Sequence, residues 1–74
     1  MRNVTVDLND IQRVKDFAKF CSRFEFDIKV ISGPHIVDAK SLLGLFSVDL
    51  SKPVTVQVPE SALEFVKLLE SGNW

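Results

Sequence analysis

Residues 38–48 have the sequence Asp38-Ala39-Lys40-Ser41-Leu42-Leu43-Gly44-Leu45-Phe46-Ser47-Val48. Aspartate is a good helix cap, so this stretch predicts a short helix over 39–46 that begins after Asp38. Leucine or phenylalanine fills four of the five positions from 42 to 46, which covers most of the circumference of such a helix. A helix that buries one face cannot bury all four of these side chains. We therefore expect some of them to face solvent.

Toward the N-terminus, apolar and polar residues alternate from Val4 to Leu8, which predicts a strand with one buried face. Asn9 is followed three residues later by Gln12, a capping-box pattern that predicts a helix over 10–23. One apolar stripe would pack this helix on the core, and its expected members are Ile11, Val14, Phe17, Ala18, Cys21 and Phe24.

Toward the C-terminus, the alternation from Phe26 to Val30 predicts a second strand, residues 32–35 a turn, and residues 36–37 a short return strand. The alternation over 54–58 predicts a fourth strand, and Pro59 suits the first position of a last helix. The expected inner face of that helix, and the glycine at its end, are Ala62, Phe65, Val66, Leu69 and Gly72.

This order of elements, βαββαβα, predicts an α+β fold of the open-faced sandwich type. A four-stranded antiparallel sheet would carry three helices on one face, because each element must bury its apolar side. A chain of 74 residues has room for one core only, so we expect residues 1–74 to form a single domain.

The composition is that of a globular protein, with 46% hydrophobic residues, 26% charged residues and a net charge of −1. That balance argues against nucleic-acid binding, which usually needs a basic excess. The longest apolar runs are too short to cross a membrane, and residues 1–7 have the pattern of a strand, so we expect a cytoplasmic location. Cys21 is the only cysteine, which excludes an internal disulfide and a cysteine-based zinc cluster. We expect it to be buried, and we expect no metal and no cofactor.

Residues 38–48 resemble the second-helix segment of the HPr phosphocarrier family of the sugar phosphotransferase system. Ala39-Lys40-Ser41, followed by Leu42-Leu43-Gly44-Leu45-Phe46-Ser47, fits that family's Ala-Lys-Ser-apolar-apolar-Gly-apolar-apolar-Ser pattern. Counted without gaps, residues 17–48 also align with the family's first helix and next two strands, and the order of elements is the same. The resemblance covers nearly the whole chain and implies an HPr-like fold without enzymatic activity.

The resemblance fails at the start of the first helix. HPr proteins carry a Gly-apolar-His-x-Arg-Pro motif there, and its histidine is phosphorylated where backbone N–H groups and the helix dipole favour phosphate. This chain has Leu8-Asn9-Asp10-Ile11-Gln12-Arg13-Val14 instead. Asp10 takes the position of the histidine when the count starts from Phe17, and Ile11 takes it when the count starts from the arginine. Neither count finds a histidine, so the phosphohistidine relay cannot be transferred to this chain.

The resemblance also implies roles for individual residues. Ser41 aligns with the serine that the HPr-type kinase phosphorylates, and Lys40 lies beside it. Leu43 and Phe46 fall on the positions that dock onto partner proteins, whereas Leu42 and Leu45 would face the core. Arg13 resembles the site arginine, offset by one position, and a guanidinium there can bind an oxyanion. The alternative is that Ser41 is an ordinary serine at a helix start and that Arg13 is solvated helix surface.

Two functions follow as hypotheses. The first is a regulatory interaction module that lacks the phosphohistidine, is phosphorylated on Ser41, and binds phosphotransferase-system proteins, an HPr-type kinase or a transcriptional regulator. The second is a phosphocarrier that uses a substitute acceptor, either Asp10 or His35. His35, the only histidine, belongs to a predicted turn between strands, and the resemblance implies that this turn is remote from the carrier site. For Asp10 the alternative is a first-turn acid that interacts with the helix dipole.

Overall fold

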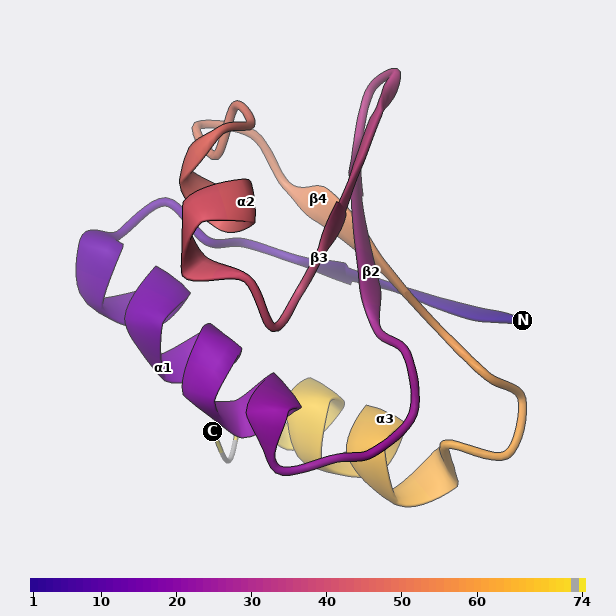
Figure 1. The fold of residues 1–74 in the computed structure, drawn as a ribbon. Coiled ribbons are helices and arrows are strands. Elements are labelled where there is room, and N and C mark those ends of the chain that lie inside the picture. The colour runs from indigo at the N-terminus through magenta and orange to yellow at the C-terminus, as the bar shows by residue number, and fades with distance from the viewer. Residues whose placement is uncertain (73) are drawn as a thin grey trace.

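The structure is a computed structural model that describes residues 1–72 and 74. Its elements are β1 (Arg2–Val6), α1 (Ile11–Ser22), β2 (Lys29–Ser32), β3 (His35–Asp38), α2 (Leu42–Phe46), β4 (Val54–Val58) and α3 (Leu63–Ser71). The strands form one antiparallel sheet in the order β1-β4-β2-β3, and the helices pack against it as an open sandwich (Figure 1). The predicted α+β class, the four-stranded antiparallel sheet and the βαββαβα order are confirmed.

The core lies on one face of the sheet because valines from all four strands stand in one row across it. Val4 pairs with Val56, Val56 with Val30, and Val30 with Val37. Val30 and Val56 in the two central strands are fully buried, whereas Val4 and Val37 in the edge strands are only half-buried. The alternation of β4 explains this directly, since Val54, Val56 and Val58 all point to the helix-covered face.

Helix α1 begins one residue later than the capping box predicts. Asp10, not Asn9, is the N-cap: its backbone is extended and its carboxylate Oδ1 accepts a hydrogen bond of 2.8 Å from the Gln12 N–H. Val14, Phe17 and Cys21 are buried as expected. Ile11 is 65% exposed, which corrects its assignment to the buried stripe. It occupies the first helical position, one turn before the stripe begins at Val14.

Helix α2 is shorter than predicted. The Ala39 N–H donates to the carbonyl of Ile28 over 2.9 Å, which continues the β2–β3 pairing past Asp38 and holds Ala39, fully buried, in the turn that follows β3. Asp38 therefore ends β3 instead of capping a helix, and its Oδ1 accepts the Lys40 N–H. The N-cap is Ser41, whose Oγ accepts a hydrogen bond of 3.1 Å from the Gly44 N–H.

Helix α3 also begins later than predicted. Pro59 lies in a turn that precedes the helix, in which the Ala62 N–H donates to the Pro59 carbonyl, and the helix begins at Leu63. Gly72 ends it in the left-handed conformation, with φ at 78°, as the sequence predicts. The inner residues are buried as expected, and the ring of Phe65 stacks on Phe20 of α1 at a centroid distance of 5.0 Å. This contact joins the two longer helices over the sheet.

Candidate functional site

A hollow of about 330 Å³ lies where the start of α1 meets the end of α2 and the following loop. Two of its walls are apolar, formed by Ile11 from α1 and Phe46 from α2, and Asp10 stands at its rim. We call it the α1–α2 hollow. Its lining residues are Leu8, Asn9, Asp10, Ile11, Val14, Phe46, Val48, Leu50 and Ser51.

The apolar side chains around this hollow continue over the surface of α2. Leu43 is 85% exposed and Phe46 44% exposed, and both assignments to the solvent side are therefore confirmed. Leu45 is fully buried, also as expected. Leu42 was expected in the core, but it is 39% exposed. As the first residue of α2 it lies over α1, where it borders Lys15 and Lys19 at the edge of the helix pair and is only partly covered.

These side chains form one apolar surface, which we call the α1–α2 face: Ile11, Leu42, Leu43 and Phe46. They make up four of the seven large hydrophobic side chains that are exposed in the described part of the chain. A concentration of this kind is typical of a protein-binding surface. The contribution of Ile11 was missed from the sequence because its spacing from Val14 fits the buried stripe. The signal that could have revealed it is its position directly after Asp10, at the N-terminus of the helix, where the first turn lies at the edge of the core.

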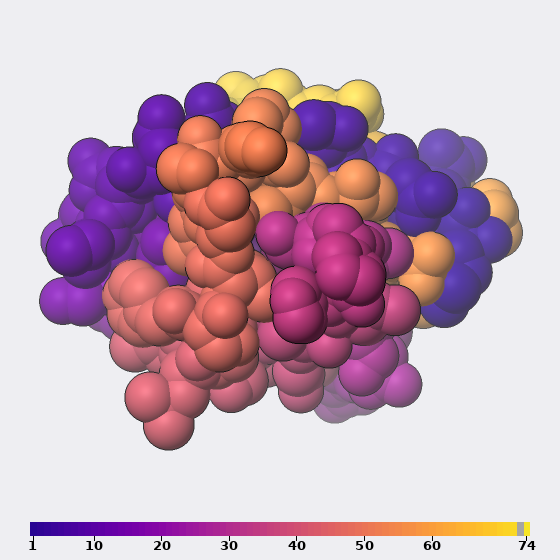
Figure 2. All heavy atoms as spheres, turned by 90° about the horizontal axis from the view of Figure 1, so that it is seen from above, coloured from indigo at the N-terminus to yellow at the C-terminus, as the bar shows by residue number. Residues whose placement is uncertain are grey.

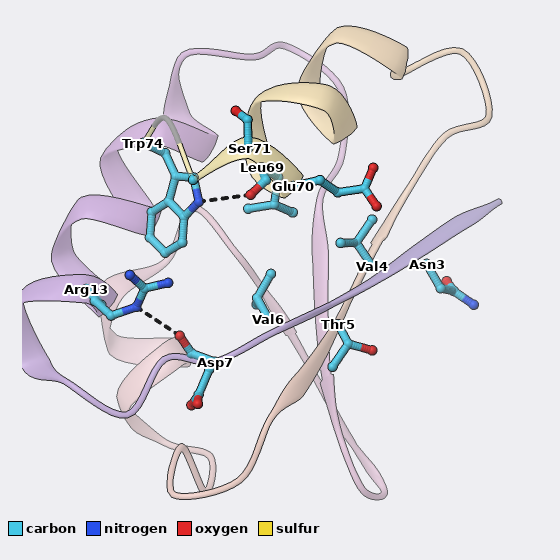
Figure 3. A pocket seen from close by; sticks show the side chains of 11 residues that line it. Asn3, Val4, Thr5, Val6, Asp7, Arg13, Leu69, Glu70, Ser71 and Trp74 are labelled. Atoms are coloured by element: carbon cyan, nitrogen blue, oxygen red, sulfur yellow. Dashed lines mark hydrogen bonds between the residues drawn. The ribbon is translucent and has the colours of Figure 1, made fainter.

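Arg13 does not line the α1–α2 hollow. Its Nε donates a hydrogen bond of 3.0 Å to the Asp7 carbonyl, and its guanidinium carbon lies 4.5 Å from the ring centroid of Trp74 (Figure 3). It thus borders a separate hollow of about 540 Å³ between β1 and the end of α3. Trp74 is held there by an edge-on contact with Phe17 at 5.5 Å and by its indole N–H, which donates to the Leu69 carbonyl.

His35 is exposed at the first position of β3, directly after the tight turn at Gly33, whose φ is 57°. The tip of this hairpin and the start of α1 lie well apart in Figure 1, and Figure 2 shows the loop after α2 between them. Asp10 and His35 are therefore not brought together, and His35 does not belong to the hollow.

Ser41 and Lys40 precede α2 and are both half-buried. The Ser41 hydroxyl caps the helix, and its backbone N–H donates to the Asp38 carbonyl over 3.0 Å. Cys21 lies fully buried under α1, and this burial raises the pKa of its thiol to about 12. The candidate modification site is thus partly accessible, whereas the single thiol is fully buried in the core.

Within residues 1–72 and 74, no group of three or more histidine, cysteine, aspartate or glutamate side chains is arranged to hold a metal ion. None of the helices in this part of the chain has the length and apolar character to cross a membrane.

No protein-family model matches the chain, and no curated protein matches it by sequence. Several solved structures are similar, among them the following two. The crystal structure of HPr-C-His from Thermoanaerobacter tengcongensis superimposes with a TM-score of 0.75 at 26% identity, over 96% of this chain and 93% of that one. The histidine-containing phosphocarrier protein of Mycoplasma superimposes with a TM-score of 0.75 at 15% identity, over 95% of this chain and 89% of that one, which shows a common fold. Together with the order of its elements and the sequence of residues 38–48, these similarities show that the chain has an HPr-like fold and resembles the HPr phosphocarrier proteins.

Proposed function

We propose that this chain is an HPr-related protein of the phosphoenolpyruvate-dependent sugar phosphotransferase system that acts by docking onto partner proteins and carries no phosphohistidine. The observation that carries the proposal is the residue at the start of α1. Asp10 occupies that position and uses its carboxylate to cap the helix, while the only histidine, His35, lies on the distant β2–β3 hairpin.

The α1–α2 face supports a docking role. Ile11, Leu43 and Phe46 are exposed on two adjacent elements, and an exposed apolar cluster costs solubility unless a partner covers it. The buried Leu45 fixes the orientation of α2 on the core, so the exposed side chains are presented on a rigid support. The partners that this role requires are proteins of the phosphotransferase system, an HPr-type kinase or a transcriptional regulator, and the protein works in the cytoplasm.

Phosphorylation of Ser41 is the proposed regulation of this face. Ser41 directly precedes Leu42 and Leu43, so a phosphate on its hydroxyl adds nearly two negative charges at the edge of the apolar surface. Lys40 would stabilise that charge and Asp38 would oppose it. Because the Ser41 hydroxyl also caps α2, its modification changes the start of the helix together with the charge of the face.

A labelling experiment separates this function from a phosphocarrier with a substitute acceptor. The protein is incubated with radiolabelled phosphoenolpyruvate and Enzyme I, beside a histidine-containing HPr as the positive control. We expect label on the control only, because no imidazole stands at the start of α1. Stoichiometric labelling of this chain, lost in Asp10→Asn or in His35→Gln, would establish the carrier function and refute ours.

A second experiment tests docking itself. The double variant Leu43→Ser/Phe46→Ser is used as bait in the lysate of the source cell, beside wild type and the control variant Leu63→Ser. Leu63 is 57% exposed on α3, outside the α1–α2 face. We expect the proteins captured by wild type to be retained by the control and lost by the double variant. Equal capture by all three baits contradicts the proposal.

A further inference from the structure

The α1–α2 hollow has apolar walls and an acidic rim. Ile11 and Phe46 form walls that remain accessible, at 65% and 44% exposure, and Val14 closes the floor. Among the described residues that line the hollow, none is a lysine, an arginine or a histidine. A negatively charged ligand would therefore meet apolar surface and a like charge there.

The Asp10 carboxylate is the charged group of this hollow. The Gln12 N–H donates to Oδ1 over 2.8 Å, which fixes the orientation of the carboxylate. In the described part of the chain no cationic group lies within 4 Å of this carboxylate, so Oδ2 remains available to a donor from outside. The helix cap thus holds an exposed and oriented acceptor beside two apolar walls.

A second carboxylate lies next to the hollow. Asp49 accepts hydrogen bonds from the N–H of Ser51 at 3.0 Å and from its hydroxyl at 2.5 Å, and Ser51 lines the hollow. These two bonds, with a smaller contribution from nearby Lys52, hold the pKa of Asp49 below its usual range. Asp49 is therefore ionised beside the hollow at neutral pH, with the opposite charge of Lys52 nearby.

The arginine that could have reversed this charge points elsewhere. Arg13 follows Asp10 by three residues, yet its guanidinium is held between the Asp7 carbonyl and the Trp74 ring on the β1 side of the helix (Figure 3). The start of α1 therefore presents a carboxylate to the hollow and a cation to a different surface.

We propose that the α1–α2 hollow receives an arginine side chain of the docking partner, with its methylene stem between Ile11 and Phe46 and its guanidinium on Asp10. This inference rests on the proposed docking function and specifies the partner chemistry at that face. Arginine is the cation that suits such a place, because it is weakly hydrated, carries an apolar stem, and is enriched where interfaces are tightest. Charge complementarity with Asp10 favours a cation over an acidic or phosphorylated group as the occupant.

Probes of defined charge test this assignment. The isotopically labelled protein is titrated with N-acetyl-arginine amide, N-acetyl-lysine amide and inorganic phosphate, each followed by backbone amide chemical shifts at constant ionic strength. We expect the arginine probe to give saturable shifts confined to residues 9–14 and 46–51, with a weaker response to the lysine probe and none to phosphate.

Two variants locate the charge that matters. Asp10→Asn keeps a good helix cap and removes the charge. We expect it to raise the dissociation constant of the arginine probe about threefold to fivefold, as for the loss of an exposed ion pair. Asp16→Asn removes a charge from the same helix outside the hollow, and we expect no effect. The assignment is wrong if phosphate or the lysine probe binds as well as the arginine probe, if the shifts map elsewhere, or if Asp10→Asn binds the arginine probe like wild type.

These results are separable from those of the docking proposal. If Leu43→Ser/Phe46→Ser loses the partner while Asp10→Asn binds it with full affinity, the docking proposal is supported and the arginine assignment is contradicted. If the double variant retains every partner while the arginine probe still binds in the hollow, the docking function is contradicted instead.

Discussion

The guanidinium carbon of Arg13 lies 4.5 Å from the centroid of the Trp74 ring, and this contact turns the arginine away from the start of α1. A cation over an indole face is stabilised by the ring quadrupole, and here the Asp7 carbonyl adds a hydrogen bond to Nε. The consequence for the site is electrostatic: the end of α1 that faces α2 keeps the charge of Asp10 without a basic neighbour.

The first prediction concerns Trp74, which links α1 to the end of α3. Its ring contacts Phe17 and Phe20, and its indole N–H donates to Leu69. We expect Trp74→Ala to lower the free energy of unfolding by roughly 1–3 kcal/mol, less than for a fully buried tryptophan because the ring is half-exposed. Urea denaturation followed by circular dichroism measures this. A loss as large as that of a core residue, or none, would contradict the packing described here.

The second prediction concerns Ser41 as a helix cap. Replacing it by alanine leaves the Gly44 N–H without its partner, and we expect a loss of about 1 kcal/mol in the free energy of unfolding. Ser41→Asp restores an acceptor at the same position and is expected to recover most of that loss. If Ser41→Ala and Ser41→Asp are equally stable, the hydroxyl does not act as a cap in solution.

The third prediction concerns modification of the same hydroxyl. An HPr-type kinase with ATP is expected to label wild type but not Ser41→Ala, with circular dichroism confirming that the variant remains folded. Ser47→Ala is the matched control, because Ser47 stands at the other end of α2 and its hydroxyl donates to the Gly44 carbonyl. We expect full labelling of this control. Equal labelling of Ser41→Ala would move the modification to another residue.

The fourth prediction is a pH dependence that originates at Cys21. Burial raises the pKa of this thiol from 9.0 to about 12, so the folded state keeps its proton where the unfolded state loses it. The contribution of Cys21 to the free energy of unfolding is fully present below pH 9. It decreases as the pH rises toward 12, by about 1.4 kcal/mol per pH unit at most. Urea midpoints between pH 8 and about 10 are expected to fall more steeply in wild type than in Cys21→Ala. Parallel profiles would show that Cys21 is not the source.

The sequence was sufficient for the architecture because the apolar periodicity is strong in the long elements. Strand β4 follows strict alternation and buries all three of its valines, and the stripe from Val14 to Cys21 is fully covered. The starts of α2 and α3 were predicted too early, because a bond to Ile28 holds the residue after Asp38 and a turn from Pro59 to Ala62 precedes α3. The Ala39 N–H bonds to the carbonyl of Ile28, just before β2, which removes the residue that would have begun the helix after Asp38.

The site was only partly predictable for the same reason. Leu43 and Phe46 follow from helical spacing once α2 is placed on the core. The exposure of Leu42 depends on how far α2 overhangs α1, and the orientation of Arg13 depends on Trp74, which is 61 residues away in the sequence. Local patterns carry no information about contacts of that range.

The last prediction distinguishes the two sides of α2 by stability. Leu45 is fully buried, so Leu45→Ala removes core contacts and leaves a cavity, at an expected loss of ~2–5 kcal/mol in the free energy of unfolding. Leu43 is 85% exposed, and Leu43→Ala is expected to change that free energy by no more than ~0.5 kcal/mol. Leu42 is only partly covered, which places Leu42→Ala between them at about 1 kcal/mol.

The three alanine variants differ by the same side-chain truncation, so each is a control for the others. Urea unfolding can be followed by the fluorescence of Trp74, the only tryptophan, which lies away from α2 on the opposite side of α1. The order Leu45, Leu42, Leu43 in decreasing cost is the expected result. If Leu43→Ala costs as much as Leu45→Ala, then Leu43 is packed inside the protein, and the α1–α2 face cannot be the docking surface because its most exposed member is not at the surface.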